Sequence, residues 1–453
     1  CKKVFKNIIA YDKFDFDGKK ESMYALRPAF DTVADMIGKG KKVPESLLEI
    51  FAQNPEYSAK LDSLINAKDK VPFKIFDKKN AEKLFGKNLN ISASQLEKFN
   101  LCRFSYFCNY GLNVRERQRA EINPMQYGTI VHYILERFFG EYTKEEYLSL
   151  EEDKFQKIVC AYLAEYAVKY FGEEQLESNS FTYRLKTILD NVMYLMKHIM
   201  EELSQSEFFV ADCELKIGED IPSYTIVLPD GHKIAVCGSV DRVDIMQRAD
   251  ITYLRIIDYK TGTKQFKLSD ILYGINLQML LYLHSIEASG SDKYGEIVPA
   301  GILYMPATVP YISSDSLKSI DKLPDELNKK LKMNGLLLKD TEIIHGMDKT
   351  DAATYIPVKI KAGEPVSSTS LATLAEFGKI FKKVDMLIAE MGKNIYNGNI
   401  EAKPLKGGHD SCEYCPYDSV CAYRQSNPIT CFSVDNKTVI EEITNEINGK
   451  EEE

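Results

Sequence analysis

The chain contains 453 residues, of which 44% are hydrophobic and 28% are charged, with a formal net charge of −9. A chain of this length is predicted to form about three domains with a large core. No apolar run approaches a membrane span, and no Gly-x4-Gly-Lys-Ser/Thr motif occurs, so the sequence excludes a transmembrane protein and a P-loop ATP site. The net charge does not by itself indicate a nucleic-acid-binding protein. The absence of a signal-peptide pattern predicts a cytoplasmic location.

The first part of the chain, residues 1–90, has a mixed helical pattern with Lys/Asp-rich connections and carries no recognisable chemistry. The sequence starts without an initiator methionine, which predicts a fragment of a longer protein. A new domain is predicted to begin near residue 91, because Ser92 and Gln95 have the spacing of a helix capping box.

Hydrophobic periodicity predicts helices first and a sheet afterwards. The early helices are expected at residues 92–102, 128–140 and 151–208. Strands are expected at residues 208–217, 224–228, 233–246, 253–260 and 300–305. The second and third of these strands flank Pro-Asp-Gly and should form a hairpin with Asp241 on its second arm. Later helices are expected at 270–288 and 367–396, and the acidic segment 431–453 is expected to be disordered.

The clearest functional pattern is Asp258-Tyr-Lys260, at the end of a predicted strand. Side chains alternate along a strand, so Asp258 and Lys260 lie on the same side. Carboxylate oxygens suit Mg²⁺ or Mn²⁺, ions that lower the pKa of water and steady charge during phosphodiester hydrolysis. We therefore assign Asp258 as a metal ligand and Lys260 as the group that orients the water or stabilises developing charge. The backbone carbonyl of Tyr259 is a further candidate ligand.

Other stretches supply compatible groups. Asp241 is a second predicted carboxylate ligand, and His132 on a predicted helix is a third ligand. Gln278 and Tyr282 are four residues apart on a predicted helix, so they share a face that would line a DNA groove. Glu214 lies on an earlier strand and is left out of the predicted site, because a glutamate on a strand is usually solvated or paired.

Each of these residues also has a structural interpretation. Asp-x-Lys is often a solvated surface pair. Asp241 precedes Arg242, as in a structural ion pair, and His132 lies among apolar residues, as a buried core histidine would. The order of the elements favours a site: a helix with His, a strand with Asp, a strand ending in Asp-x-Lys and a helix with Gln and Tyr. Chance rarely supplies all four.

This order resembles the RecB-type branch of the PD-(D/E)XK nucleases, and within it the C-terminal nuclease domain of the AddB family. The resemblance covers about residues 91–424 and includes the segments 106–119 and 332–338. It implies a restriction-endonuclease-like α/β core, with a mixed central sheet flanked by helices, over residues 91–430. Residues 1–90 would then be a helical remnant of a preceding helicase-like region.

The resemblance also implies a function. His132, Asp241, Asp258 and Lys260 match the catalytic set of the family, in which a Mg²⁺-dependent exonuclease hydrolyses single-stranded DNA. The 5′→3′ polarity is inherited from the family, since no residue shows it. An AddA-type helicase-nuclease subunit is the implied partner. It would supply ATP-driven unwinding while the heterodimer processes double-strand breaks for homologous recombination.

Three of the ten cysteines form Cys412-x2-Cys415-x5-Cys421, which leaves a tetrahedral site one ligand short. The spacing suits zinc and iron-sulfur equally, and a disulfide is less expected in a cytosolic chain. By resemblance, Cys102 supplies the fourth thiolate and the group is a [4Fe-4S] cluster that joins the start of the domain to its end. Cys108 stands where the family has an apolar residue, which complicates the ligand assignment.

Two other functions stay open. One is a free-standing or CRISPR-associated RecB-like exonuclease with the same four cysteines, against which the segment 332–338 argues. The other is a non-catalytic DNA-binding or scaffold module with a structural cluster. The intact residues Asp241, Asp258 and Lys260 argue against this second alternative.

Overall fold

The computed structural model describes residues 25–38, 41–66, 74–115, 124–172, 178–262, 265–309, 323–350, 354–367, 369–421, 423 and 428–451. It divides into two compact units, residues 1–74 and 75–453. The described helices of the first unit are α1 (Leu26–Gly38), α2 (Glu45–Gln53) and α3 (Ser58–Asn66). The rings of Phe30, Phe51 and Tyr57 form the centre of its core, with centroids 4.9 to 5.6 Å apart.

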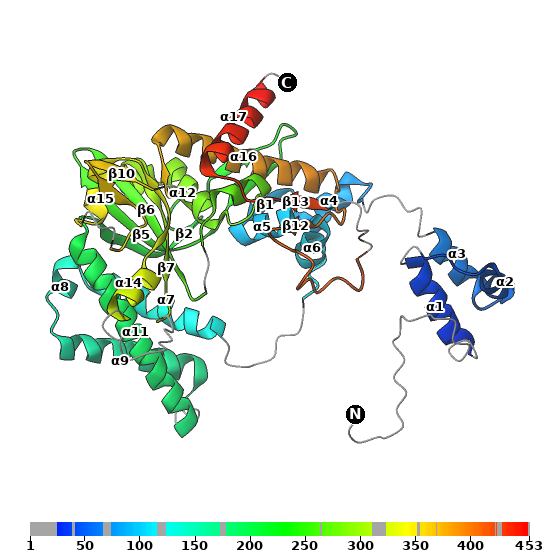
Figure 1. Ribbon diagram of the computed structural model, residues 1–453, viewed down its shortest axis with the longest axis horizontal. Coiled ribbons are helices and arrows are strands. Elements are labelled where there is room, and N and C mark those ends of the chain that lie inside the picture. Colours follow the sequence, from blue (N-terminus) through cyan, green and yellow to red (C-terminus); the bar gives the residue numbers. More distant parts are fainter. Residues whose placement is uncertain are drawn as a thin grey trace. The chain divides into compact units, whose positions relative to one another are not determined.

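The second unit is built around a mixed sheet of six strands in the order β11-β8-β7-β6-β5-β2 (Figure 1). In chain order the strands are β2 (Phe209–Ile217), β5 (Gly238–Arg248), β6 (Ile251–Lys260), β7 (Glu296–Pro306), β8 (Asn334–Leu338) and β11 (Leu371–Ala372). Strands β6 and β7 run parallel and are buried along most of their length, as central strands covered on both faces must be. The predicted mixed α/β core is confirmed.

Helices cover both faces of this sheet. One face is covered by α7 (Pro124–Glu141), α8 (Lys144–Leu148), α9 (Glu152–Phe171) and α11 (Asn179–Gln205). The other face is covered by α12 (Gln278–Ser289) and α16 (Leu374–Tyr396), which appear on the opposite side of the strands in Figure 1. The helical layer that the sequence places ahead of the sheet is therefore present.

The remaining elements of the second unit are short. The helices are α4 (Lys78–Phe85), α5 (Ala93–Leu101), α6 (Arg103–Tyr106), a π-helical turn η3 (Phe107–Gly111), α13 (Ser291–Tyr294), α14 (Leu323–Leu331) and α15 (Thr341–Met347). The strands are β9 (Lys359–Lys361) with β10 (Glu364–Val366), and β12 (Leu405–Gly407) with β13 (Ile429–Cys431). The predicted capping box at the start of α5 is confirmed, with Ser92 and Gln95 bonded reciprocally.

The predicted hairpin arm that carries Asp241 is wrong, because this segment divides into two strands in two sheets. β4 (Lys233–Val236) pairs with β3 (Thr225–Val227) and with β1 (Asn88–Ile91), whereas β5 joins the central sheet. The break falls at Gly238, where an ideal Cβ would lie 2.3 Å from the Tyr282 hydroxyl. Only glycine permits this close approach, and Asp241 consequently pairs into the sheet between β2 and β6.

The predicted helix over residues 270–288 is also wrong. A 3₁₀ turn, η4 (Leu268–Tyr273), ends at Gly274, and α12 begins only at Gln278. Gly274 and Asn276 have φ angles of 68° and 53°, in the left-handed region that a right-handed helix cannot contain. Gln278 therefore occupies the first turn of its helix.

Both ends of the second unit differ from the prediction. The acidic C-terminal segment is not disordered over its described part, because it forms α17 (Asn436–Glu451), whose Val439 and Ile443 are fully buried. The unit begins at residue 75, before the predicted boundary, since α4 packs against α16. Residues 116–119 and 452–453, which the sequence assigned to the nuclease segment and the tail, lie outside the described residues.

Candidate active site

Strand β6 delivers Asp258 and Lys260 to the end of the central sheet. Their side chains lie on the same side, as period 2 predicts, and Lys260 Nζ lies 2.6 Å from Asp258 Oδ2. Gln278 reaches the same carboxylate from the start of α12, its Nε2 donating to Asp258 Oδ1 over 3.0 Å. Asp258 is buried while Lys260 is partly accessible, so this pair is not the solvated surface pair of the alternative interpretation.

Asp241 lies on the neighbouring strand, β5, where its Oδ2 accepts a hydrogen bond from the backbone N–H of Tyr259 over 2.9 Å. Burial, together with the charge of Asp258, raises the pKa of Asp241 to about 7. The two carboxylates therefore share a poorly solvated region that lacks enough positive charge.

His132 approaches the two strands from α7. Its Nδ1 lies 2.8 Å from Glu214 Oε1 and its Nε2 lies 3.6 Å from Asp241 Oδ2. Burial by itself would lower the pKa of His132, but the hydrogen bond to Glu214 and the nearby carboxylates raise it. Its ring meets the Tyr259 ring edge-on at 5.8 Å between centroids. His132 is thus tied to acidic groups at the sheet end and is not a core histidine.

Glu214 is the residue that the sequence analysis missed. Its neighbours in β2 pair with Arg242 and Val240, which sets Glu214 opposite Asp241. Its φ angle is 52°, a left-handed conformation that is uncommon outside glycine and is often found at functional sites. Ser239 Oγ donates to its second carboxylate oxygen over 2.9 Å. An acidic residue on the strand next to Asp241 was the available signal.

His132, Glu214 and Asp241 offer ligand atoms that all lie within 4.8 Å of one another. Within the described chain this is the only group of three or more His, Cys, Asp or Glu side chains with such spacing. His132, Glu214 and Lys260 also line a cavity of about 650 Å³. The arrangement provides carboxylate oxygens, an imidazole nitrogen and an ammonium group at one accessible place.

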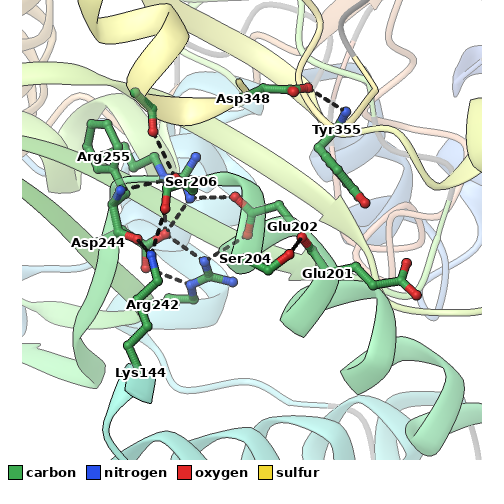
Figure 2. A network of polar contacts seen from close by, with 12 residues as sticks. Lys144, Glu201, Glu202, Ser204, Ser206, Arg242, Asp244, Arg255, Asp348 and Tyr355 are labelled. Carbon is green, nitrogen blue, oxygen red and sulfur yellow. Dashed lines mark hydrogen bonds and ion pairs between the residues drawn. The ribbon is translucent and has the colours of Figure 1, made fainter. Parts of the chain in front are cut away.

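Arg242 does not pair with Asp241, so the structural interpretation of that dipeptide is wrong. Alternation along β5 turns Arg242 to the opposite face, where it binds Asp244 over 2.6 Å and Glu202 of α11 over 3.1 Å (Figure 2). Arg255 on β6 binds the same two carboxylates over 2.9 and 2.6 Å. All four side chains are fully buried, so this network fastens α11 to the two strands that carry the site.

Tyr282 does not line an open groove. It is buried, and its hydroxyl lies against Gly238, at the point where the chain enters β5. Gln278 is the partly accessible residue of the predicted pair, and it contacts the site directly through Asp258. Tyr282 therefore supports the strand that carries Asp241, whereas Gln278 belongs to the site.

The family model that describes the PD-(D/E)XK nuclease superfamily matches residues 90–422. The chain belongs to the PD-(D/E)XK nuclease superfamily. The match begins at the small strand β1 and includes every residue of the site, so the family assignment and the geometry refer to the same region.

Relatives of this PD-(D/E)XK chain carry one name, which describes the AddB-type subunit of an ATP-dependent helicase/deoxyribonuclease. The protein from Clostridium acetobutylicum is 30% identical over 93% of this chain, and that from Clostridium kluyveri is 35% identical over 84%. The protein from Thermoanaerobacter sp. is 34% identical over 76% of this chain. The matches span only 30 to 38% of these relatives. The predicted resemblance to AddB proteins is confirmed.

The PD-(D/E)XK domain also brings distant cysteines together. Cys102, at the junction of α5 and α6, is buried in one cluster with Cys108, and Cys415 and Cys421 pack against this cluster. Burial raises the pKa of Cys421, and so do the charges of Cys102, Cys415 and Cys412. The four predicted ligands therefore lie near one another, with Cys108 as a fifth thiol.

The C-terminal cysteine loop is fastened by hydrogen bonds. The Tyr417 hydroxyl donates to the Val114 carbonyl over 2.7 Å, and the N–H of Cys412 donates to Asp410 over 2.8 Å. Cys431 lies in a different cluster. Finally, none of the described helices combines the length and apolar character needed to cross a membrane.

Proposed function

We propose that this chain is a metal-dependent exodeoxyribonuclease whose catalytic set is His132, Asp241, Asp258 and Lys260, with Glu214 added as a metal-binding residue. The observation that carries the proposal is the compact group of His132, Glu214 and Asp241 beside the Asp258–Lys260 pair. These donors fit a hard divalent cation, Mg²⁺ or Mn²⁺. The raised pKa of Asp241 supports this fit, because a cation would relieve the excess negative charge.

The residues have distinct roles in this proposal. Asp241, Asp258 and His132 would hold the metal, and when bound the ion lowers the pKa of water and steadies charge on the phosphate oxygens. Lys260 presents its ammonium on the same side as Asp258, where it orients the attacking water or stabilises charge on phosphorus oxygens. Gln278 donates to Asp258 and so fixes the orientation of that carboxylate.

For the cysteines we propose a [4Fe-4S] cluster held by Cys102, Cys412, Cys415 and Cys421. Sulfurs that share one zinc ion lie roughly 3.8 Å apart, as follows from tetrahedral bonds of about 2.3 Å. No three of the described cysteine sulfurs lie within 4.8 Å of one another, which supports a larger group than one ion. Backbone groups of Phe104, Ser105 and Lys403 hydrogen-bond to the Cys102 sulfur and lower its pKa against the effect of burial. Such bonds are typical of cluster ligands.

We further propose the biological setting. The relatives are named as a helicase/deoxyribonuclease subunit, and this chain matches about a third of their length. The substrate would be single-stranded DNA, cut in the 5′→3′ direction. An AddA-type subunit would complete a cytoplasmic heterodimer that processes double-strand breaks for homologous recombination. ATP-driven unwinding would come from that partner.

The test is Mg²⁺-dependent cleavage of 5′-labelled single-stranded DNA by anaerobically purified chain, with Lys260→Ala alongside. Cleavage that disappears in the variant supports the nuclease and its site, and the product lengths report the polarity. DNA binding without cleavage in either protein contradicts an autonomous nuclease and favours a scaffold. Reconstitution with an AddA-type subunit then shows whether the partner is required. Full activity without a partner favours a free-standing RecB-like exonuclease.

A further inference from the structure

A row of tyrosine rings lines one wall of the candidate active site. Tyr133 directly follows His132 on α7, and Tyr166 and Tyr170 lie about one turn apart on α9. All three tyrosines line the cavity of about 650 Å³ that also contains His132 and Glu214. The rings therefore face the same space as the metal-binding groups.

The rings form a continuous stack that ends in an accessible side chain. The centroids of Tyr133 and Tyr166 are 5.2 Å apart, and those of Tyr166 and Tyr170 are 4.4 Å apart. Tyr166 is buried, whereas Tyr170 is 55% exposed. Lys169 places its Nζ 5.9 Å from the Tyr133 centroid and 5.2 Å from the Tyr170 centroid. A rigid aromatic surface beside a cation is the arrangement on which proteins stack nucleic-acid bases.

Building on the proposed nuclease function, we propose that Tyr133, Tyr166 and Tyr170 form a stacking platform for the bases of single-stranded DNA, with Tyr170 as the outermost contact. Bases in a duplex are already stacked and paired, so only unpaired nucleotides can use such a surface. The platform would give the site its preference for single strands.

The charges around the cavity set the orientation of the strand. Glu136 lines the cavity on the tyrosine side, and a hydrogen bond joins Tyr133 to Glu165. These carboxylates repel phosphates from this wall but tolerate neutral bases. Lys216 and Lys260 line the same cavity and attract the phosphates. The bases therefore face the tyrosines while the sugar-phosphate backbone faces the lysines and the metal-binding residues.

The test is binding of fluorescein-labelled oligothymidylate to the whole chain in EDTA, which prevents cleavage. Tyr170→Ala should weaken binding by about 5- to 100-fold, the range for losing one base-stacking contact. Tyr170→Phe keeps the ring and should bind close to wild type. Because Tyr170 is mostly exposed, the alanine variant should keep the thermal stability of the wild type, which circular dichroism checks.

Two controls separate stacking from general effects. An abasic oligonucleotide of the same length has the phosphates without the bases, so Tyr170→Ala should not change its affinity. Tyr183 on α11 is 73% exposed and does not line the cavity, so Tyr183→Ala should bind oligothymidylate normally. Wild-type affinity in Tyr170→Ala, or equal losses for both oligonucleotides, overturns the platform.

Failure of the platform and failure of the nuclease give different results. If the wild type cuts DNA and Lys260→Ala does not, but Tyr170→Ala binds normally, the nuclease stands and the platform is wrong. If no variant cuts DNA but Tyr170→Ala loses base-dependent binding, the platform stands and the nuclease proposal fails.

Discussion

Two groups of charged side chains lie on opposite faces of strand β5, and they differ in their charge balance. On the face covered by α11, the guanidinium groups of Arg242 and Arg255 meet the carboxylates of Asp244 and Glu202, and all four are fully buried (Figure 2). On the other side, Asp241 begins a group in which carboxylates outnumber cations. Consecutive residues of one strand thus belong to a balanced and to an unbalanced group.

The difference in balance separates structure from function. A buried group with equal charges needs nothing further, and removing one member leaves an uncompensated charge. The site group contains Asp241, Asp258 and Glu214 against Lys260 and a histidine, and burial with the charge of Asp258 raises the pKa of Asp241 to about 7. It opens on a cavity, where a cation can enter. Unbalanced carboxylates at a cavity therefore indicate a metal site.

The largest effect is expected from Asp258→Ala. Cleavage should fall by at least about 10²- to 10³-fold, the range for removing one group that stabilises the transition state. The visible iron-sulfur absorbance should not change, because Asp258 is remote in function from the cysteines. The measurement combines a cleavage assay with an absorbance spectrum, and Asp250→Ala at the exposed turn after β5 is the control. Loss of absorbance in Asp258→Ala would contradict separate catalytic and structural sites.

Cys412→Ala tests the structural role of the proposed cluster. The variant should lose iron and visible absorbance, and the domain should unfold or melt at a lower temperature, because ligand binding contributes to the folding free energy. Iron analysis and circular dichroism measure these effects. Cys431→Ala, which lies in a different cluster, should retain its iron. Full iron content in Cys412→Ala would point to Cys108 as the ligand.

Arg242→Met tests the balanced group. The variant leaves Asp244 and Glu202 short of one cation, so the free energy of unfolding should fall by about 3–5 kcal/mol. Urea unfolding measures the change. Arg248 lies on the same strand and pairs with Glu207 at the surface, so Arg248→Met should cost about 1 kcal/mol or less. Equal costs for the two variants would remove the distinction between the buried and exposed pairs.

Glu214→Gln gives the smallest expected effect and extends the unbalanced group. If Glu214 helps to bind or orient the metal, the Mn²⁺ concentration for half-maximal cleavage should rise about 10- to 100-fold. Saturating Mn²⁺ should restore much of the rate. Glu219→Gln, an exposed glutamate after the same strand, is the control. An unchanged Mn²⁺ requirement would limit the metal group to the residues predicted from sequence.

Local pattern accounts for what the sequence could predict. Alternation along one strand placed Asp258 beside Lys260, and capping chemistry placed the start of α5 at Ser92. Glu214 could not be found in this way, because its role depends on the pairing of β2 with β5 and on a left-handed backbone angle. Such features follow from tertiary structure, which propensity does not encode.

The same reasoning explains the errors in the elements. The break at Gly238 arises from the packing of Tyr282, a contact between residues 44 positions apart (282 minus 238). The C-terminal helix was obscured by its acidic composition, although Val439 and Ile443 have the i, i+4 spacing of a buried stripe. That stripe is stable only because the preceding helix α16 covers it.

The loop that meets Cys102 lies almost at the end of the described chain, and this has a consequence for biosynthesis. Cys421 follows Cys102 by 319 positions (421 minus 102). At a translation rate of about 5–20 residues per second, the ribosome needs roughly 15 to 60 s to synthesise that interval. All strands of the central sheet leave the ribosome within it. Iron would therefore be inserted into a sheet that has had time to form, as a closing step of maturation.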